Sequence, residues 1–355
     1  MTTGAASSPI DTGTIDPKLL STDALGEKRA FLASGAAWPD ERPPVCIETP
    51  RSLVFVTQHL VYKLKKPLHL PSGDLRFLGP RARICAEDFR LNHRFAPDLY
   101  LGLVPLVRGI DGALVLGGHG RVVDWLLVMK RLPAAQMLDR RLAVGPTPHW
   151  DEMADFGARL IRSYERQPGG LLAGLVYHKH LRTNLASDAQ HLTMLLPHLG
   201  TFPLADLLAW SATRLAFAAP EIWMRAMMGC LRKGHGDLRA RHVCLTDPPF
   251  AFHRVAVVPD DLLVDPYYEI TGLGLDAAKS GVEWIGPALL SQLTQTGFRP
   301  PSPRLLVLYA VLQCLAQARA ALALSLVTTP SPQTQDLHQV RCRLAMAVRI
   351  AENHS

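Results

Sequence analysis

The sequence predicts an α+β protein with two lobes, a small β-rich lobe followed by a larger helical lobe. Two short apolar runs, Leu53–Val56 and Leu60–Leu64, flank a turn and have the composition of a β-hairpin. Beyond Pro133 the apolar residues recur at helical spacing, as they do between Met153 and Tyr164. Strands that precede a run of helices are typical of an α+β fold. The predicted parts are a flexible leader at 1–30, a β-rich lobe at 31–132 and a helical lobe at 133–355.

The composition is that of a packed globular protein. Of the 355 residues, 48% are hydrophobic and 19% are charged, which is enough apolar material for a sizeable core. The formal net charge is +7, but the basic residues are scattered, with one short run at Lys63, Lys65 and Lys66, so we expect no nucleic-acid partner. The six cysteines form no CxxC pair, and the N-terminus has no basic segment followed by an apolar core. These features predict a cytoplasmic protein in a reducing compartment.

The longest apolar segment, Leu305–Val327, predicts a buried helix. Gln313, Gln317 and Arg319 interrupt it, and each would be costly in the hydrocarbon of a membrane. The segment could bury in the helical lobe or form a dimer face, and the frequency with which apolar stripes belong to cores favours the first. We therefore expect no membrane contact.

A helix with a carboxylate on its apolar face follows the hairpin. Pro80 suits its first turn. Asp88 falls on the same face as apolar residues, whereas Glu87 falls among arginines on another face. A buried carboxylate is costly unless it is paired, so Asp88 should have a cationic partner. Further strands are predicted at 113–116 and 122–129.

Two lysines on the preceding strand are the candidate partners of this carboxylate. Lys63 and Lys65 lie on one face of their strand because side chains alternate. Where a strand lysine binds the phosphates of a nucleotide, an acidic residue of the next helix holds it in place. A lone strand lysine is more often a solvated edge charge, but Asp88 favours the pair. Lys63, which follows the small apolar Val61, is the expected phosphate ligand.

The rest of a nucleotide site is less distinct in the sequence. The turn Thr57–His59 has no glycine, so a Gly-rich phosphate loop is not visible. The strand that ends near Met129 would offer hinge backbone groups to a purine, with Arg131 beside them, although other strand ends look the same. The expected cofactor is ATP or another nucleotide.

The segment Gly234–Leu238 has the pattern of a catalytic loop for phosphoryl transfer. Such a loop needs an Asp that orients the attacking hydroxyl and accepts its proton, and Asp237, which follows His235 by two positions, fits that role. Five residues later an Asn should bind magnesium, but His242 stands there. After the next predicted hairpin, His253 stands where a second metal-binding Asp is expected. Both expected metal ligands are therefore replaced by histidine.

The two histidines leave two interpretations. Each histidine, taken alone, is more often structural than a metal ligand. Magnesium prefers oxygen ligands, and loss of both should lower a phosphoryl-transfer rate by several orders of magnitude, which predicts a pseudoenzyme. Imidazole instead suits zinc, copper, nickel or iron. A transition metal held by His242 and His253, with Asp237 as the base, is therefore the alternative.

Five segments together share a pattern with a known family. They are Glu48–Phe55, Val61–Pro67, Arg90–Gly102, Val123–Trp125 with Met129–Arg131, and His235–Leu238. With these segments the chain resembles the aminoglycoside phosphotransferase-like, or protein-kinase-like, family, in particular its bacterial branch often fused to a C-terminal P-loop ATPase domain. The resemblance runs from about Phe31 to beyond Asp276, and this sequence has no segment for the ATPase domain.

The resemblance implies a two-lobed protein-kinase-like (aminoglycoside phosphotransferase) fold, with Lys63 on phosphate and Asp237 as the base. It also implies that Asp265–Glu269 is a structural acidic motif on a helix near the site. The sequence departs from the family pattern by Asp88 for Glu, His242 for Asn, His253 for Asp and Ala256 for Glu.

We therefore predict a pseudokinase with impaired magnesium-dependent phosphotransfer that acts as a binding or regulatory protein. The alternative is an active ATP-dependent phosphotransferase that acts on a small-molecule hydroxyl and has an unusual metal site containing histidine. The expected partner is accordingly a protein or a small-molecule acceptor, and the sequence does not select between them because function belongs to sites rather than folds.

Overall fold

The chain folds into two units, and a computed structural model describes residues 25–38, 42–70, 73–166, 170–195, 202–252, 263–328 and 334–354. The first unit comprises the residues up to His93 together with Pro97–Arg131, and the second comprises Arg94–Ala96 with the residues from Leu132 onward. Most of the predicted leader (1–24) and the two departures His253 and Ala256 lie outside the described residues.

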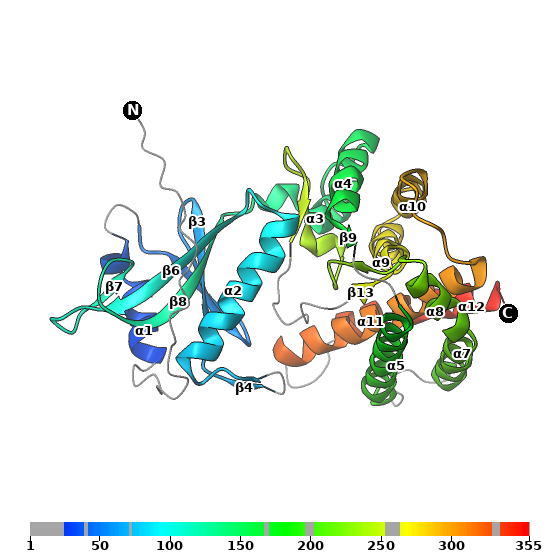
Figure 1. Cartoon of the computed structure of the whole chain (residues 1–355), viewed down its shortest axis with the longest axis horizontal. Coiled ribbons are helices and arrows are strands. Elements are labelled where there is room, and N and C mark those ends of the chain that lie inside the picture. Colours follow the sequence, from blue (N-terminus) through cyan, green and yellow to red (C-terminus); the bar gives the residue numbers. More distant parts are fainter. Residues whose placement is uncertain are drawn as a thin grey trace. The chain divides into compact units, whose positions relative to one another are not determined.

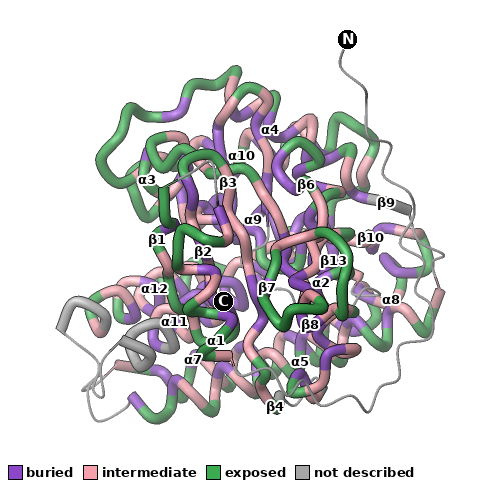
Figure 2. The backbone as a smooth tube through the Cα atoms, turned by 90° about the vertical axis from the view of Figure 1, so that its left-hand side faces the viewer, coloured by how far each residue is buried: buried purple, intermediate pink, exposed green. Residues whose placement is uncertain are grey.

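The first unit is built on a six-stranded antiparallel sheet with the strand order β1-β2-β3-β8-β6-β7, and helices α1 and α2 flank this sheet (Figure 1). The edge strand β1 is largely exposed (Figure 2). The elements of the unit are α1 (Leu25–Ala33), η1 (Gly35–Ala37), β1 (Val45–Glu48), β2 (Ser52–Val56), β3 (Leu60–Lys65), β4 (His69–Leu70), β5 (Gly73–Asp74), α2 (Leu78–Phe95), β6 (Tyr100–Arg108), β7 (Leu114–Leu116) and β8 (Arg121–Lys130).

Side-chain alternation sorts the two faces of this sheet. Leu53 on β2 lies opposite Leu64 on β3, and both belong to the core that α1 joins through Leu32. Lys63 and Lys65 point to the opposite face, where α2 provides Asp88 as their partner. The hairpin, the helix that follows it and the strands at 113–116 and 122–129 are therefore confirmed as predicted elements.

Strand β6 is absent from the predicted elements, and Pro105 is the physical reason. Proline has no N–H to donate, so a proline within an apolar run argues against an inner strand. In the structure Pro105 lies opposite Trp125 of β8, whereas the pairing of β6 with β7 is confined to Leu106–Arg108. The carbonyl of Pro105 accepts a hydrogen bond from the N–H of Gly117 at 2.8 Å. The residue without an N–H donor, Pro105, therefore lies just beyond the end of the β6–β7 pairing.

Part of the predicted flexible leader is folded, because α1 begins at Leu25. Its Lys28 is 2% exposed and donates hydrogen bonds to the carboxylate of Asp124 at 2.8 Å and to the carbonyl of Val123 at 2.9 Å. Arg81 of α2 binds the same carboxylate at 3.0 Å. A buried lysine needs such a partner, and this one lies far away in the sequence, which explains why local composition did not reveal the helix.

The second unit is mainly helical, as predicted, with a three-stranded sheet β13-β10-β9 and the predicted hairpin β11-β12. Its elements are η2 (Ala134–Gln136), α3 (Leu138–Ala143), α4 (Trp150–Ser163), β9 (Glu165–Arg166), α5 (Leu171–Thr193), α7 (Leu204–Phe217), α8 (Ala219–Met227), β10 (Arg232–Lys233), η3 (Ala240–His242), β11 (Val243–Cys244), β12 (Phe250–Ala251), β13 (Leu263–Val264), α9 (Pro266–Lys279), α10 (Ile285–Gln295), α11 (Pro303–Thr328) and α12 (Thr334–Glu352).

Helix α11 lies in a core that it shares with α5, α7, α8 and α12, while a second core joins α4, α9 and α10 to the hairpin. Among the described residues, α11 is the helix whose length and composition would suffice to cross a membrane, and 61% of its apolar stretch is buried. The side-chain amides of Gln313 and Gln317 donate to the carbonyls of Tyr268 (3.0 Å) and Gly272 (2.9 Å) in α9. The predicted burial of this helix in the fold is confirmed.

Candidate functional site

The first candidate site is a lysine cluster, which consists of Lys63, Lys65 and Asp88. The Nζ atom of Lys65 lies 2.6 Å from Oδ2 of Asp88, whereas that of Lys63 lies 3.8 Å from the same oxygen. Asn92, one turn further along α2, donates to the other carboxylate oxygen at 3.1 Å. The expected lysine–carboxylate pair is therefore present, but Lys65 rather than Lys63 makes its shorter contact. Asp88 is long enough to hold both lysines although it is one methylene shorter than Glu.

The lysine cluster carries an excess of positive charge in a buried place. The side chains of Lys63, Lys65 and Asp88 are 15%, 6% and 1% exposed. Burial lowers the pKa of Lys63 below its usual value; Asp88 opposes this shift, and Lys65 adds to it. The neighbouring Cys85 contributes no charge, because burial raises the pKa of its thiol to about 12. Two ammonium groups thus share one carboxylate, which favours the binding of an anion.

The two hairpin turns that join β1 to β2 and β2 to β3 contain no glycine. In both turns a threonine hydroxyl donates to the carbonyl and accepts from the N–H of the residue three positions later. Thr49 is linked to Ser52 in this way at 2.8 and 2.9 Å, and Thr57 to Leu60 at 3.1 Å. In a glycine-rich loop, backbone N–H groups point at a phosphate. Here the N–H groups of Ser52 and Leu60 donate to the threonine hydroxyls of the turns instead.

The predicted hinge residues are integrated into the sheet. Met129 pairs with residues on both neighbouring strands. The N–H of Lys130 donates to the carbonyl of Leu99 at 2.9 Å, and the N–H of Arg131 donates to the carbonyl of His59 at 2.8 Å. These two N–H groups are consequently committed to the sheet rather than offered to a purine.

The second candidate site is the predicted catalytic loop, Gly234–Leu238, which Glu269 of α9 holds in place. Glu269 is 3% exposed and accepts hydrogen bonds from the N–H of His235 at 3.1 Å, from the N–H of Gly236 and from the hydroxyl of Tyr164 at 3.0 Å. Gly236 has φ +88°, a conformation that favours glycine. Arg94 adds a bond of 2.8 Å to the carbonyl of Gly234. The loop is therefore held by the buried carboxylate of Glu269 and by the partly buried guanidinium of Arg94.

Asp237 projects from this loop with 46% of its side chain exposed. The side chain of Arg241 approaches it, with 3.4 Å between Nη2 and Oδ2. His242 is 3% exposed; its Nδ1 lies 2.7 Å from the backbone carbonyl of Asp237, and its Nε2 accepts from Nε of Arg241 at 3.2 Å. A carbonyl only accepts and a guanidinium only donates, so these partners require the neutral tautomer with the proton on Nδ1. Both ring nitrogens of His242 are thus engaged, one by the backbone carbonyl of Asp237 and the other by Arg241.

The other acidic and imidazole groups of the region are buried. The ring of His235 is 0% exposed and packs against the rings of Phe95 (5.1 Å) and His242 (6.1 Å). Asp265, also 0% exposed, binds the guanidinium of Arg225 at 2.6 Å and the hydroxyl of Tyr309 at 3.1 Å. Glu269 thus holds the loop from α9, whereas Asp265, the N-cap of that helix, binds Arg225 and Tyr309.

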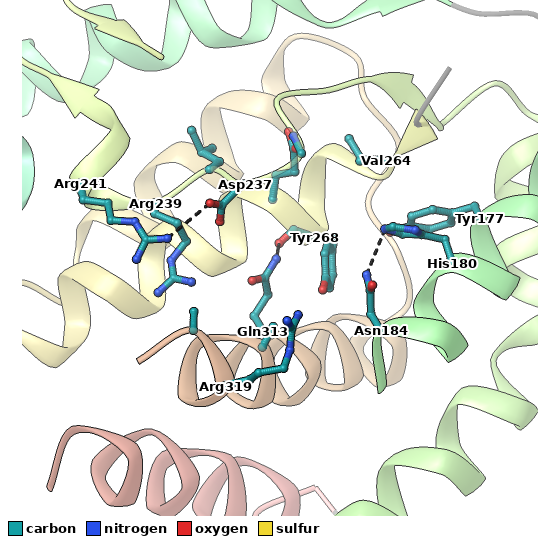
Figure 3. Close-up of a pocket in the computed structure, with 15 residues that line it drawn as sticks. Tyr177, His180, Asn184, Asp237, Arg239, Arg241, Val264, Tyr268, Gln313 and Arg319 are labelled. Carbon is teal, nitrogen blue, oxygen red and sulfur yellow. Dashed lines mark hydrogen bonds and ion pairs between the residues drawn. The ribbon is translucent and has the colours of Figure 1, made fainter. Parts of the chain in front are cut away.

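A cavity of about 350 Å³, which we call the loop cavity, opens beside Asp237 within the second unit (Figure 3). Residues of the catalytic loop, α5, α9 and α11 line it. Figure 3 shows Arg239 and Arg241 extending from the loop side and Arg319 from α11. The sequence placed neither Arg239 nor Arg241 in a site. Arg319 could have been suspected from the sequence, because a charged residue within an apolar core helix needs either an ion-pair partner or a polar cavity.

Comparisons with known proteins find likenesses in structure alone. No family model matches the sequence, and no curated protein matches it. A thermostable mutant of the aminoglycoside phosphotransferase APH(4)-Ia is similar with a TM-score of 0.49 and 10% identity, over 93% of this chain and 99% of that one. A choline/ethanolamine kinase family protein from Mesorhizobium loti is similar with a TM-score of 0.46 and 15% identity, over 92% and 94%.

A third likeness is to the aminoglycoside phosphotransferase APH(3'')-Id from Streptomyces rimosus, in a structure that is a complex with ADP and streptomycin. The TM-score is 0.44 and the sequence identity is 16%, over 82% of this chain and 98% of that one. In the present chain, the antiparallel sheet unit carries the lysine–carboxylate pair, and the helical unit carries the loop with its hairpin. This arrangement, a β-rich unit followed in the chain by a mainly helical unit, is the α+β architecture that the sequence predicted.

Proposed function

We propose that this chain is a kinase-like protein that binds a nucleotide and has lost ordinary magnesium-dependent phosphotransfer, and that it acts as a binding or regulatory protein. One observation carries the proposal. His242, at the position of the expected magnesium ligand, has both ring nitrogens engaged, by the carbonyl of Asp237 and by Arg241. A neutral imidazole has one lone pair, and here it accepts from a guanidinium instead of facing a metal.

The described residues do not fit a magnesium ion. No group of three His, Cys, Asp or Glu side chains placed to hold a metal occurs in the part of the chain that the structure describes. Magnesium prefers carboxylate and carbonyl oxygens, whereas the side chain next to Asp237 is the cation Arg241. A fixed guanidinium beside the catalytic carboxylate opposes the approach of a second cation. This arrangement supports the proposal that the positive charge of Arg241 takes the place of a metal ion beside Asp237.

Nucleotide binding is supported by the charge of the lysine cluster. Lys65 takes the short contact with Asp88, and Lys63 stays at the longer distance of 3.8 Å with 15% of its side chain exposed. Lys65 would therefore hold the carboxylate while Lys63 contacts a phosphate. An anion beside Lys63 would also relieve the repulsion between the two ammonium groups.

The proposal is tested by thermal-shift titrations with ATP, ADP and AMP, each with magnesium, manganese, zinc or EDTA. We expect ATP and ADP to stabilise the protein in EDTA as well as in magnesium, and no phosphate transfer to occur. A shift that needs a metal would contradict the proposal, because the nucleotide would then be held through an ion. Absence of any shift would contradict the nucleotide site.

Lys63→Met is expected to weaken ATP binding by about tenfold or more, since a hydrogen bond to a charged group is lost. The variant should also be more stable than the wild type at neutral pH. Because the folded-state pKa of Lys63 is lowered, its charged form opposes folding below that pKa, and this cost fades as the pH rises towards the unfolded value. Titration calorimetry and urea unfolding measure the two effects. Lys66→Met is the matched control, because Lys66 pairs with Glu48 instead.

An active phosphotransferase that acts on a small-molecule hydroxyl is the second candidate, because Asp237 is exposed on a loop that Glu269 keeps in order. The wild type should then turn over ATP with manganese or zinc, whereas His242→Asn with His253→Asp should confer magnesium-dependent turnover only if the metal ligands alone were lost from an otherwise intact site. Turnover of ATP by the wild type with manganese or zinc, together with a silent double variant, would refute the pseudokinase proposal. A silent wild type and an active double variant would show that only the metal ligands had been lost.

A further inference from the structure

The loop cavity presents guanidinium groups whose hydrogen-bonding capacity is only partly used. Arg241 and Arg319 have 35% and 34% of their side chains exposed. Nε of Arg319 donates a hydrogen bond to the buried carboxylate of Asp188, and no hydrogen bond of its two Nη groups occurs among the described residues. Arg241 uses Nε on His242 and Nη2, at 3.4 Å, on Asp237, which leaves its Nη1 without a described partner. Two arginines on different elements therefore offer N–H donors to one cavity.

The carboxylates of the cavity do not balance these donors. The described lining contains two, Asp237 and Glu269. Glu269 is 3% exposed and already accepts from two backbone N–H groups and the hydroxyl of Tyr164. Asp237 is thus the lining carboxylate that can still accept a hydrogen bond from a ligand. Arg239 adds a third guanidinium, which Asp276 holds at 3.0 Å. The described lining thus presents three guanidinium groups and one carboxylate, Asp237, that can still accept from a ligand, while Asp188 and Asp276 pair with Arg319 and Arg239 from outside the lining.

We propose that the loop cavity binds a small organic anion that also bears a hydroxyl group. Its phosphate or carboxylate would be held by the guanidinium groups of Arg241 and Arg319, which match such oxygens better than an ammonium does. Its hydroxyl would donate to Asp237. The volume of about 350 Å³ is near the lower end of ligand pockets, which suits a single ring or a short chain. The proposal rests on the second unit alone and does not require a nucleotide.

The test is a set of calorimetric titrations of the full chain with four probes on one sugar frame: glucose 6-phosphate, gluconate, glucose and glucosamine. We expect saturable binding of at least one of the two anions, weakened by added salt, and much weaker binding of glucose and glucosamine. The two anions separate a phosphate ester from a carboxylate as the preferred group. Preference for glucosamine, or no saturable binding of either anion, overturns the proposal.

Two variants place the binding at the cavity. Arg241→Gln and Arg319→Gln should each weaken the anion by about tenfold or more, whereas Arg304→Gln, at an exposed position of the same helix α11 as Arg319, should not. Because Arg319→Gln leaves Asp188 buried without its cation, the double variant Asp188→Asn with Arg319→Gln is measured as well. Equal binding by the wild type and by these variants overturns the site. ATP titrations of the wild type decide the nucleotide proposal separately.

Discussion

Replacement of Asp88 with alanine is expected to lower the free energy of unfolding of the first unit by about 3–5 kcal/mol, because it removes one partner of a buried ion pair. Asp88 is the carboxylate for Lys65 at 2.6 Å and for Lys63 at 3.8 Å, and it is 1% exposed. Without it, two ammonium groups remain in a poorly hydrated space and repel each other. The amide of Asn92 also loses its acceptor on the carboxylate.

Urea unfolding measures this loss, and Glu87→Ala is the control. Glu87 is the neighbouring residue of the same helix and is exposed, so its replacement should change the stability by less than about 0.5 kcal/mol. The cost of Asp88→Ala should shrink as the pH rises, because burial already lowers the pKa of Lys63 and the loss of the Asp88 carboxylate lowers it further, so that Lys63 loses its proton at a lower pH in the folded variant than in the unfolded chain. Adding Lys65→Met to Asp88→Ala should recover part of the stability. Equal costs for the two alanine variants would exclude the buried pair.

The sequence predicted those elements of the fold whose signals are local. The β2–β3 hairpin, the helix with Asp88 on its apolar face and the hairpin after the loop each depend on residues within a few positions of one another. Strand β6 and helix α1 depend on distant partners instead. Pro105 is tolerated because the pairing with β7 ends beside it, and Lys28 is buried because Asp124 lies across the sheet.

For the candidate site, too, the sequence identified the residues, whereas their contacts depend on the folded structure. Alternation places Lys63 and Lys65 on one face, but only the geometry assigns the shorter contact with Asp88 to Lys65. The pattern of the loop identifies Asp237 and His242 as positions, whereas the engagement of His242 by Arg241 depends on ring orientation. Histidine next to arginine is a signal for such a contact, but sequence alone gives no orientation.

Glu269→Ala is expected to cost about 3 kcal/mol or more in the second unit, because each buried donor left unpaired costs roughly 1–3 kcal/mol. Three donors lose their acceptor: the N–H groups of His235 and Gly236 and the hydroxyl of Tyr164. Tyr164→Phe removes one of these bonds and should cost about 1 kcal/mol. Glu283→Ala, at an exposed position, is the control. Hydrogen exchange of the loop amides should accelerate in Glu269→Ala but not in the control.

The change with pH in the cost of Glu269→Ala distinguishes loss of the carboxyl group from a general loosening of the core, which would cost the same at every pH. Burial raises the pKa of Glu269, and the two backbone N–H groups and Tyr164 only partly oppose this shift. A carboxyl group whose folded-state pKa is raised stabilises the fold fully below its unfolded pKa, and that contribution is lost as the pH rises through the folded value. The cost of Glu269→Ala should therefore be larger at about pH 5 than at about pH 8. An equal cost at both pH values would mean that hydrogen bonds, rather than the charge, dominate how Glu269 holds Asp237 in its loop.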